Sequence, residues 1–188
     1  MQKMLKELID EIFRCNFKQY GWKKRGLNYR YVDESGLGRV INFQRSRWNR
    51  ADDIEIFINY GLYIEVENEL VNKVFKEYEC QFSARTRFNG GRYRFNADTC
   101  IEEARKQLER ALEEATDLFA KVENKEMFVS LLLSGELKKY SVNRIMDYYT
   151  CKLLSDMGYH EEIYDIVKTK GGPYFEALAV ELEAKLKC

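Results

Sequence analysis

The stretch RVINFQRSRWNRADDIEIFINYGLYIEV, residues 39–66, predicts the centre of the fold. Its second half alternates apolar residues with polar or small ones at a period of two, which is typical of a β-strand with one buried face. The residues that this pattern places on the buried face are Ile54, Ile56, Ile58, Tyr60, Leu62, Ile64 and Val66. Ile41 and Phe43 predict a preceding strand with the same buried face. The polar loop at residues 47–53 has the composition of a hairpin loop, and Gly61 indicates a bulge or a close backbone approach.

The segments around this hairpin predict a helix and further strands. An amphipathic stripe indicates a helix over residues 3–20, closed by Gly21 and followed by a basic turn at residues 23–26. Alternation predicts strands at residues 27–32 and at about residues 80–88, and residues 67–79 are compatible with a short helix. Asn89-Gly90-Gly91 is a strong turn signal, after which Tyr93 and Phe95 add a short fifth strand.

From residue 98 onward the apolar period becomes helical. Thr99 and Glu102 match a capping box at the start of a long helix, and further helices are expected at about residues 125–134, 141–157, 160–169 and 173–187. We therefore predict an α+β fold with a mainly antiparallel sheet of four or five strands, helices packed on one face, and a small helical C-terminal subdomain. The sheet domain spans residues 1–124 and the helical subdomain residues 125–188, packed together as a single compact unit.

Composition and cysteine usage narrow the class of protein. The chain has 188 residues, a formal net charge of zero and 33% charged residues, which is typical of a soluble globular protein. Its longest apolar run is too short to span a bilayer, and its N-terminus is a charged amphipathic stretch unlike a signal peptide. We therefore expect a cytoplasmic protein without a membrane partner. Five scattered cysteines, no C-x-x-C pair and a single histidine predict reduced thiols and no zinc site.

Residue parity along the strands predicts a binding face on the side of the sheet that the helices leave open. Two further residues of the site, Arg45 and Arg47, are expected at the rim of the helix-covered face near the hairpin loop. The residues assigned to this site are Arg30, Asn42, Gln44, Arg45, Arg47, Trp48, Phe57, Asn59, Tyr63, Arg85 and Arg87. Among them we expect a cluster of four polar side chains in a concavity lined by two aromatic rings. The four are Arg30, Gln44, Asn59 and Arg85, and the rings are Phe57 and Tyr63.

The residue types of this face suit a carboxylate or phosphate ligand, because guanidinium forks and amides recognise such groups. Asparagine is a poor strand former, so Asn42 and Asn59 in neighbouring strands are unexpected. Two structural explanations stand beside a ligand site: an antiparallel sheet often has one solvated, polar face, and amides can pair across strands.

An enzymatic function has little support. The sequence holds no phosphate-binding loop and no dinucleotide fingerprint, so we expect no cofactor. A cysteine nucleophile would need His160 as its base, and His160 resembles a surface cap after Gly158. Asp52, Asp53 and Glu55 could hold a hard cation, although acidic groups near a loop are usually solvated, and we expect no metal.

Several short motifs, which agree in order and spacing, resemble domain-of-unknown-function family 4304. They are GWKKRGLNYRY from residue 21, VINFQRSRWN from residue 40, IFINYGLY from residue 56 and EYECQFSAR from residue 77. The segment LLSDMGYHEEIYDIV from residue 153 is similar to a short helical tail of that family, so that the resemblance covers most of residues 5–165. No activity comes with the family.

Similar small α+β proteins are often immunity partners of bacterial toxins, and this analogy favours a non-enzymatic cytosolic binding protein. In that role, immunity- or antitoxin-like, the partner is a protein that presents an acidic surface or loop. The alternative is binding of RNA or another phosphate ligand on the arginine-rich and aromatic sheet face, although the neutral net charge argues against nucleic acid. An uncharacterised enzyme is the third hypothesis, and the sequence makes no prediction of oligomeric state.

Overall fold

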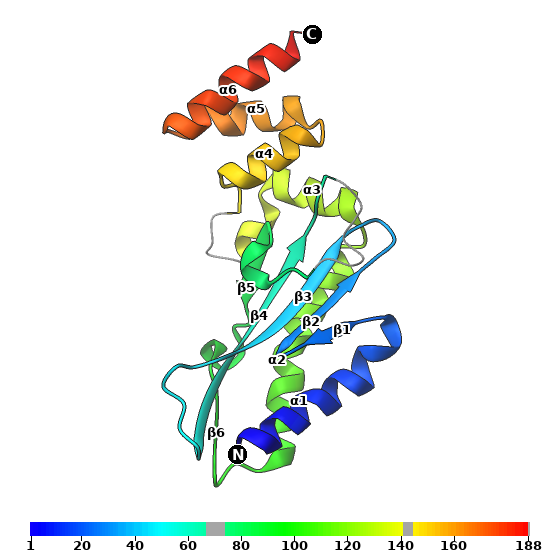
Figure 1. Cartoon of the computed structure of the whole chain (residues 1–188), viewed down its shortest axis with the longest axis vertical. Helices are drawn as coiled ribbons and strands as arrows, with labels where there is room; N and C mark the ends of the chain where they lie inside the picture. The colour runs from blue at the N-terminus through cyan, green and yellow to red at the C-terminus, as the bar shows by residue number, and fades with distance from the viewer. Residues whose placement is uncertain (67–73, 141–144, 188) are drawn as a thin grey trace.

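A computed structural model describes residues 1–66, 74–140 and 145–187, and it confirms the α+β fold (Figure 1). The strands are β1 (Lys23–Arg25), β2 (Asn28–Val32), β3 (Gly38–Arg45), β4 (Asp53–Tyr63), β5 (Phe82–Arg85) and β6 (Tyr93–Asn96). The α-helices are α1 (Gln2–Asn16), α2 (Ile101–Lys121), α3 (Lys125–Ser134), α4 (Tyr148–Asp156), α5 (His160–Lys168) and α6 (Pro173–Leu186). Short 3-10 turns are η1 (Lys18–Tyr20), η3 (Glu77–Glu79), η4 (Phe88–Gly91) and η5 (Glu136–Lys139).

The sheet is antiparallel throughout, and β4 is its longest strand and pairs with three others. Its strands follow the order β1-β2-β3-β4-β5, and β6 pairs with β4 beside that path. The period of two in β4 is confirmed, because the side chains that it placed inside are at most 1% exposed from Ile54 to Ile64. Val66 is the exception at 48% exposed, since it follows the end of β4.

β5 and β6 share one edge of β4, which corrects the predicted role of the Asn89-Gly90-Gly91 turn. Ile56 pairs with Arg45 of β3 and with Tyr93 of β6, so β6 lies on the edge away from β3. Asn59 pairs with Asn42 and Arg85 in the same way. The two strands therefore run in the same direction along β4, and η4 interrupts them without reversing the chain.

Several predicted boundaries differ from the structure. The basic turn at residues 23–26 is instead strand β1, so that the sheet has six strands where four or five were expected. The predicted strand at residues 80–88 is shorter, because the chain leaves the ladder after Arg85. The predicted capping box is wrong: Cys100 is the N-cap of α2, and the Thr99 hydroxyl hydrogen-bonds to Asn96 instead.

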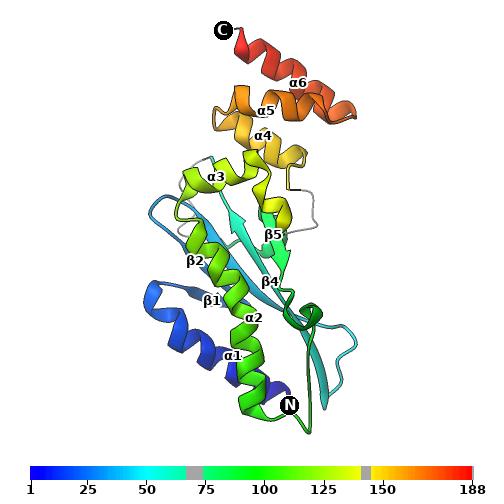
Figure 2. The same ribbon diagram turned by 180° about the vertical axis from the view of Figure 1, so that it is seen from behind.

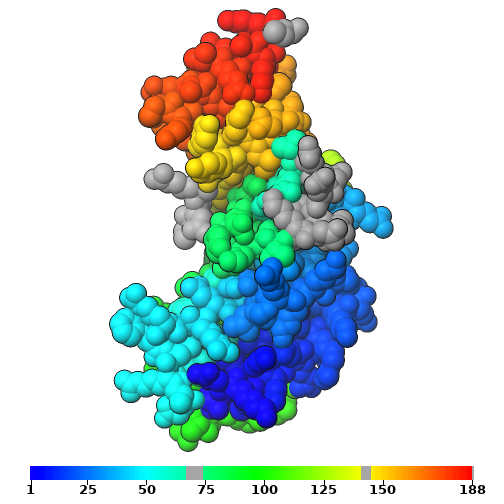
Figure 3. Space-filling model, viewed as in Figure 1, coloured from blue at the N-terminus to red at the C-terminus, as the bar shows by residue number. Residues whose placement is uncertain are grey.

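Helices α1 and α2 cover one face of the sheet, as Figure 2 shows from behind. Apolar side chains of both helices, including Ile12 and Leu108, pack with Ile41 and Ile56 in one continuous core. The same core extends through α3 into the C-terminal helices, which lie at one end of the molecule and leave the front of the sheet uncovered (Figure 3). No described helix is both long and apolar enough to cross a membrane.

The other face of the sheet is crossed at one end by the segment 74–80. Phe75 of this segment stacks on Tyr63, with ring centroids 4.8 Å apart, and is 1% exposed. Glycines make room for it, since a Cβ at Gly38 would lie 2.7 Å from the Phe75 ring. Part of the short helix predicted for residues 67–79 lies outside the described residues, and the described part forms η3.

Candidate functional site

One residue from each of five neighbouring strands lies in a single row across the open face of the sheet. The row is formed by Cα-paired residues, in the order Arg25, Asn28, Asn42, Asn59 and Arg85. Because side chains alternate along a strand, one register places all five on the same side. A consecutive row of polar residues therefore runs from β1 to β5, with an arginine at each end.

Hydrogen bonds join four members of this row side chain to side chain. Arg85 Nε donates to Asn59 Oδ1 at 3.0 Å, and Asn59 Nδ2 donates to Asn42 Oδ1 at 3.3 Å. Asn42 Nδ2 in turn donates to Asn28 Oδ1 at 2.9 Å. The pairing of amides across the strands, one of the structural explanations raised by the sequence, is thus present.

Gln44 and Phe57 join the row beside Arg85. Gln44 Oε1 accepts from Asn59 Nδ2 at 3.0 Å and from Arg85 Nη2 at 3.1 Å. The Arg85 guanidinium lies over the Phe57 ring, 4.1 Å from its centroid, a distance at which a cation is attracted to an aromatic face. We name Asn28, Asn42, Gln44, Phe57, Asn59 and Arg85 the arginine–amide cluster.

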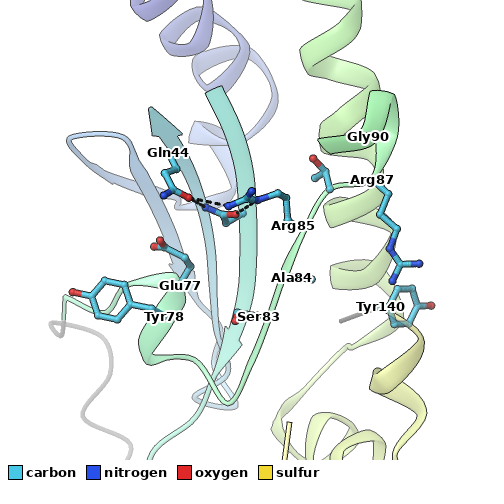
Figure 4. A pocket seen from close by; sticks show the side chains of 11 residues that line it. Gln44, Glu77, Tyr78, Ser83, Ala84, Arg85, Arg87, Gly90 and Tyr140 are labelled. Carbon is cyan, nitrogen blue, oxygen red and sulfur yellow. Dashed lines mark hydrogen bonds between the residues drawn. The ribbon is translucent and has the colours of Figure 1, made fainter. Parts of the chain in front are cut away.

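Three members of the cluster, Gln44, Asn59 and Arg85, form one wall of an open hollow of about 730 Å³. Figure 4 shows Gln44 and Arg85 hydrogen-bonded on this wall, with Glu77 and Tyr78 of η3 on a second side. Arg87 and Tyr140 lie across from them. Asn59 is 8% exposed at the base, whereas Gln44 and Arg85 are exposed. Burial and the charge of Arg92 lower the pKa of Arg85.

Arg87 reaches the hollow differently from the prediction. The strand ends at Arg85, so Arg87 does not continue the polar face of β5. Its Nη2 donates to the carbonyl oxygen of Lys139 at 2.6 Å, and its main-chain N–H donates to Glu114 at 2.7 Å. Arg87 therefore ties the end of β5 to α2 and to η5.

Arg30 lies on the predicted face but away from Gln44, Asn59 and Arg85. It lines a second hollow of about 590 Å³ with Arg25 and Asn28, and Tyr78 borders both hollows. Its Nε and Nη1 are buried without a hydrogen-bond partner in the described chain. Burial and the nearby charge of Arg25 lower the pKa of Arg30.

Four other predicted site residues do not reach the cluster. Tyr63 was expected to line the concavity, but Phe75 covers its ring and its hydroxyl donates to Glu65 at 2.6 Å. Arg45 is the last residue of β3, and Arg47 and Trp48 lie in the loop between β3 and β4. Trp48 is 77% exposed and the Arg47 guanidinium lies 4.8 Å from its ring centroid.

Sequence reasoning missed three kinds of residue that shape this site. Arg25 was placed in a turn, and Asn28 was not assigned to the site. Glu77 and Tyr78 border the hollow from a segment whose path across the sheet no local pattern predicts. Tyr140 arrives from the region after α3, far along the chain, and carries no sequence signal for this place.

The groups of the cluster are suited to binding and orienting a ligand, since guanidinium and amide groups do not act as acids or bases near neutral pH. Elsewhere, burial raises the pKa of the Cys151 thiol to about 11, and His160 contacts the Ser155 carbonyl oxygen at 2.9 Å. In the three described ranges, no group of three or more His, Cys, Asp or Glu side chains could hold a metal ion.

The family model described as Domain of unknown function (DUF4304) matches residues 13–151. The chain belongs to the DUF4304 family. The match confirms the resemblance found in the motifs, and it spans the whole sheet with the arginine–amide cluster. It ends inside α4, so the segment at residues 153–167, expected to be the tail of the family, lies beyond it. No curated protein and no solved structure matches the chain.

Proposed function

We propose that this DUF4304 protein is a non-enzymatic binding protein that uses the arginine–amide cluster to hold an acidic surface or loop of a partner protein. The observation that carries this proposal is the pre-assembled wall of Gln44, Asn59 and Arg85 beside an open hollow. Side chains that already hold one another lose less conformational freedom on binding, which favours affinity. The Phe57 ring adds apolar contact area under the Arg85 guanidinium.

A protein partner suits this face better than a nucleic acid does. Glu77 lines the same hollow as Arg85, and Glu79 lines the neighbouring hollow with Arg30. A phosphate backbone requires neutralisation by a run of positive charges, and carboxylates within that run weaken it. The formal net charge of zero agrees with a surface that selects a local acidic group rather than a polyanion.

RNA binding is the second candidate, because one observation favours it. Arg47 lies over the ring of Trp48, which is 77% exposed at the hairpin tip, and an exposed aromatic ring beside a guanidinium can stack on a base. Trp48 lies in the loop between β3 and β4 and is not a member of the arginine–amide cluster. An RNA-binding role would therefore depend on Trp48, whereas a protein-binding role depends on Arg85.

A more specific form of this proposal is a cytoplasmic immunity- or antitoxin-like role in a bacterium. Such a protein neutralises its partner by occupying it, so it needs a stable binding face and no chemistry of its own. The preformed cluster and the open hollow beside it support that proposal.

The proposal is tested by capture from the source cell with the tagged full chain. We expect a partner that binds wild type, binds Arg85→Ala at least tenfold more weakly, and binds the control Arg110→Ala like wild type. Arg110 is an exposed arginine of α2 that pairs with Glu113, so the control removes the same charge elsewhere. Association should slow with added salt, as electrostatic steering requires.

Two results would contradict the proposal. One is a partner that binds Arg85→Ala and wild type equally well. The other is a mixed RNA pool that binds wild type at low salt and is lost in Trp48→Ala but retained in Arg85→Ala, which would favour the second candidate. Thermal melting of each variant shows whether it is folded.

A further inference from the structure

The arginine–amide cluster has a direction, because Arg85 can only donate hydrogen bonds. A guanidinium has no acceptor, so the oxygen and nitrogen of the neighbouring amides are assigned by this neighbour without ambiguity. Asn59 must turn Oδ1 toward Arg85 Nε, and Gln44 must turn Oε1 toward Arg85 Nη2. Arg85 thus sets the orientation of both amides that touch it.

The orientation of Asn59 determines the orientation of the next amides in the row, as far as β2. With Oδ1 facing Arg85, Asn59 directs both N–H groups of Nδ2 away from it, toward Gln44 Oε1 and Asn42 Oδ1. Asn42 then has Nδ2 left for Asn28, whose Oδ1 accepts it at 2.9 Å. Every amide oxygen of the row is occupied by an internal donor.

The side-chain groups of the cluster that have no partner at all are therefore donors. Asn28 Nδ2, Gln44 Nε2 and Arg85 Nη1 have no hydrogen-bond partner among the residues that the structure describes. Asn59, the most buried member, uses its oxygen and both N–H groups inside the cluster. Each amide oxygen already accepts an internal hydrogen bond, whereas these N–H groups remain to meet a ligand.

We propose that the cluster is a carboxylate-recognition site whose donor character is fixed by Arg85, with Gln44 supplying a free amide N–H beside Arg85 and Asn28 supplying another at the neighbouring hollow. This inference rests on the proposed function and names the group that the partner inserts, the carboxylate of an aspartate or glutamate side chain. A planar carboxylate accepts two parallel hydrogen bonds from an amide and a guanidinium side by side. Glu77 in the same hollow disfavours the higher charge of a phosphate.

The surrounding charges agree with this assignment. Arg25 lies beside Asn28 in the row, and Arg92 is close enough to lower the pKa of Arg85. Glu55 acts in the opposite direction on Arg85, so the face is positive without being a continuous basic stripe. The site therefore attracts a single acidic side chain or a short acidic loop.

The decisive variant is Gln44→Glu. A glutamate at this position keeps an acceptor oxygen for Asn59 and for Arg85, so both internal hydrogen bonds of Gln44 can persist and the melting temperature should not fall. The change replaces the free N–H groups with a carboxylate beside Arg85. Hexaglutamate is the probe, and its affinity for Gln44→Glu should be at least tenfold lower than its affinity for wild type. Gln19→Glu, on the exposed turn η1, makes the same change of charge and should bind like wild type.

Asn28→Asp is a second variant with the same logic. The aspartate still accepts from Asn42 Nδ2, while the outward amide N–H groups are lost. In wild type, hexaglutamate should shift the side-chain amide signals of Asn28 and Gln44 in a ¹⁵N-resolved spectrum, and hexaglutamine should not. Wild-type binding by folded Gln44→Glu, or no shift of either amide signal, would overturn the inference. So would a six-nucleotide RNA that shifts these signals when hexaglutamate does not.

The two proposals fail in different ways. A captured partner that is lost in Arg85→Ala but binds Gln44→Glu like wild type would leave the proposed function standing and remove the carboxylate site. Hexaglutamate binding that follows the expected pattern, without any partner that depends on Arg85, would keep the carboxylate site and remove the proposed function.

Discussion

Arg39 carries a charge inside the protein, where the turn before β3 meets the end of α2. It is 7% exposed, and its guanidinium donates to Asp33 Oδ2 at 2.6 Å and to the carbonyl oxygen of Val122 at 2.7 Å. Burial acts to raise the pKa of Asp33, but hydrogen bonds from Ser35, Arg39 and the Leu37 main chain bring that pKa below its usual value. Through its hydrogen bond to Val122, Arg39 joins the start of β3 to the end of α2, 83 residues later in the chain.

Arg39→Met should therefore lower the free energy of unfolding by about 3–5 kcal/mol, because Asp33 would keep a buried charge without its partner. Urea denaturation at pH 7 measures this. The stabilisation by Asp33 is fully present above the unfolded carboxyl pKa of about 3.9 and is lost as the pH falls through the lowered folded pKa. Arg110→Met, which removes an exposed partner of Glu113, is the control and should change little. Equal losses in the two variants would contradict the prediction.

Single residues show how much of the site the alternation of side chains along a strand can predict. Alternation placed Asn42, Gln44, Asn59 and Arg85 on one face from the sequence, because a strand leaves two sides to choose from and the core takes one. It placed Tyr63 on that face as well, but parity contains no information about the segment that covers it. The buried role of Arg39 was missed for the same reason, since the end of α2 with Val122 covers it through a tertiary contact.

Among the elements, β4 shows a strand that depends on a glycine for close packing. A Cβ at Gly61 would lie 2.8 Å from Cys80 Sγ and 2.9 Å from the Phe82 carbonyl oxygen. Of the two possibilities that the sequence raised for this glycine, a close backbone approach is the one that the structure shows. The segment that includes η3, one border of both hollows, is held against the sheet at this point.

Gly61→Ala should destabilise the fold by about 1–3 kcal/mol, because the added methyl group forces the β5 backbone away from β4. Gly171→Ala is the matched control, since a Cβ there meets nothing within 4 Å and its backbone is not left-handed. Thermal melting compares the two. If Gly61→Ala melts like the Gly171→Ala control, the segment 77–82 does not need the close approach.

The type of an element was predicted well where a periodic pattern runs over many residues. It was predicted poorly where pairing with a distant segment determines whether a strand forms. The helix stripes of α1 and α2 and the alternation of β4 are strong local signals. β1 has three residues, Lys23-Lys24-Arg25, and becomes a strand by pairing with β2. The Asn89-Gly90-Gly91 turn signal was correct in position, but local turn chemistry did not reveal that β6 returns to the same edge of β4.

On the scale of the whole molecule, the helices after α3 form layers at one end of an elongated chain (Figure 1). α6 packs mainly against α5 and α4, and most of its residues are exposed or half-buried. The apolar core nevertheless continues from the sheet to Leu178 and Leu182 of α6. A terminal layer that contacts one neighbouring layer opens more readily than a central strand paired on both edges.

This arrangement predicts an asymmetry between two similar core variants, Ile56→Ala in β4 and Leu182→Ala in α6. Both side chains are at most 1% exposed, and each change should remove about 2–5 kcal/mol of stability. Ile56→Ala should lower the opening free energy of β4 amides in native-state hydrogen exchange and leave that of α6 amides unchanged, because α6 opens while the sheet is still folded. Leu182→Ala should lower both, since every opening of β4 includes the loss of α6. If Ile56→Ala lowers the opening free energy of α6 amides as much as that of β4 amides, the whole chain opens as one unit.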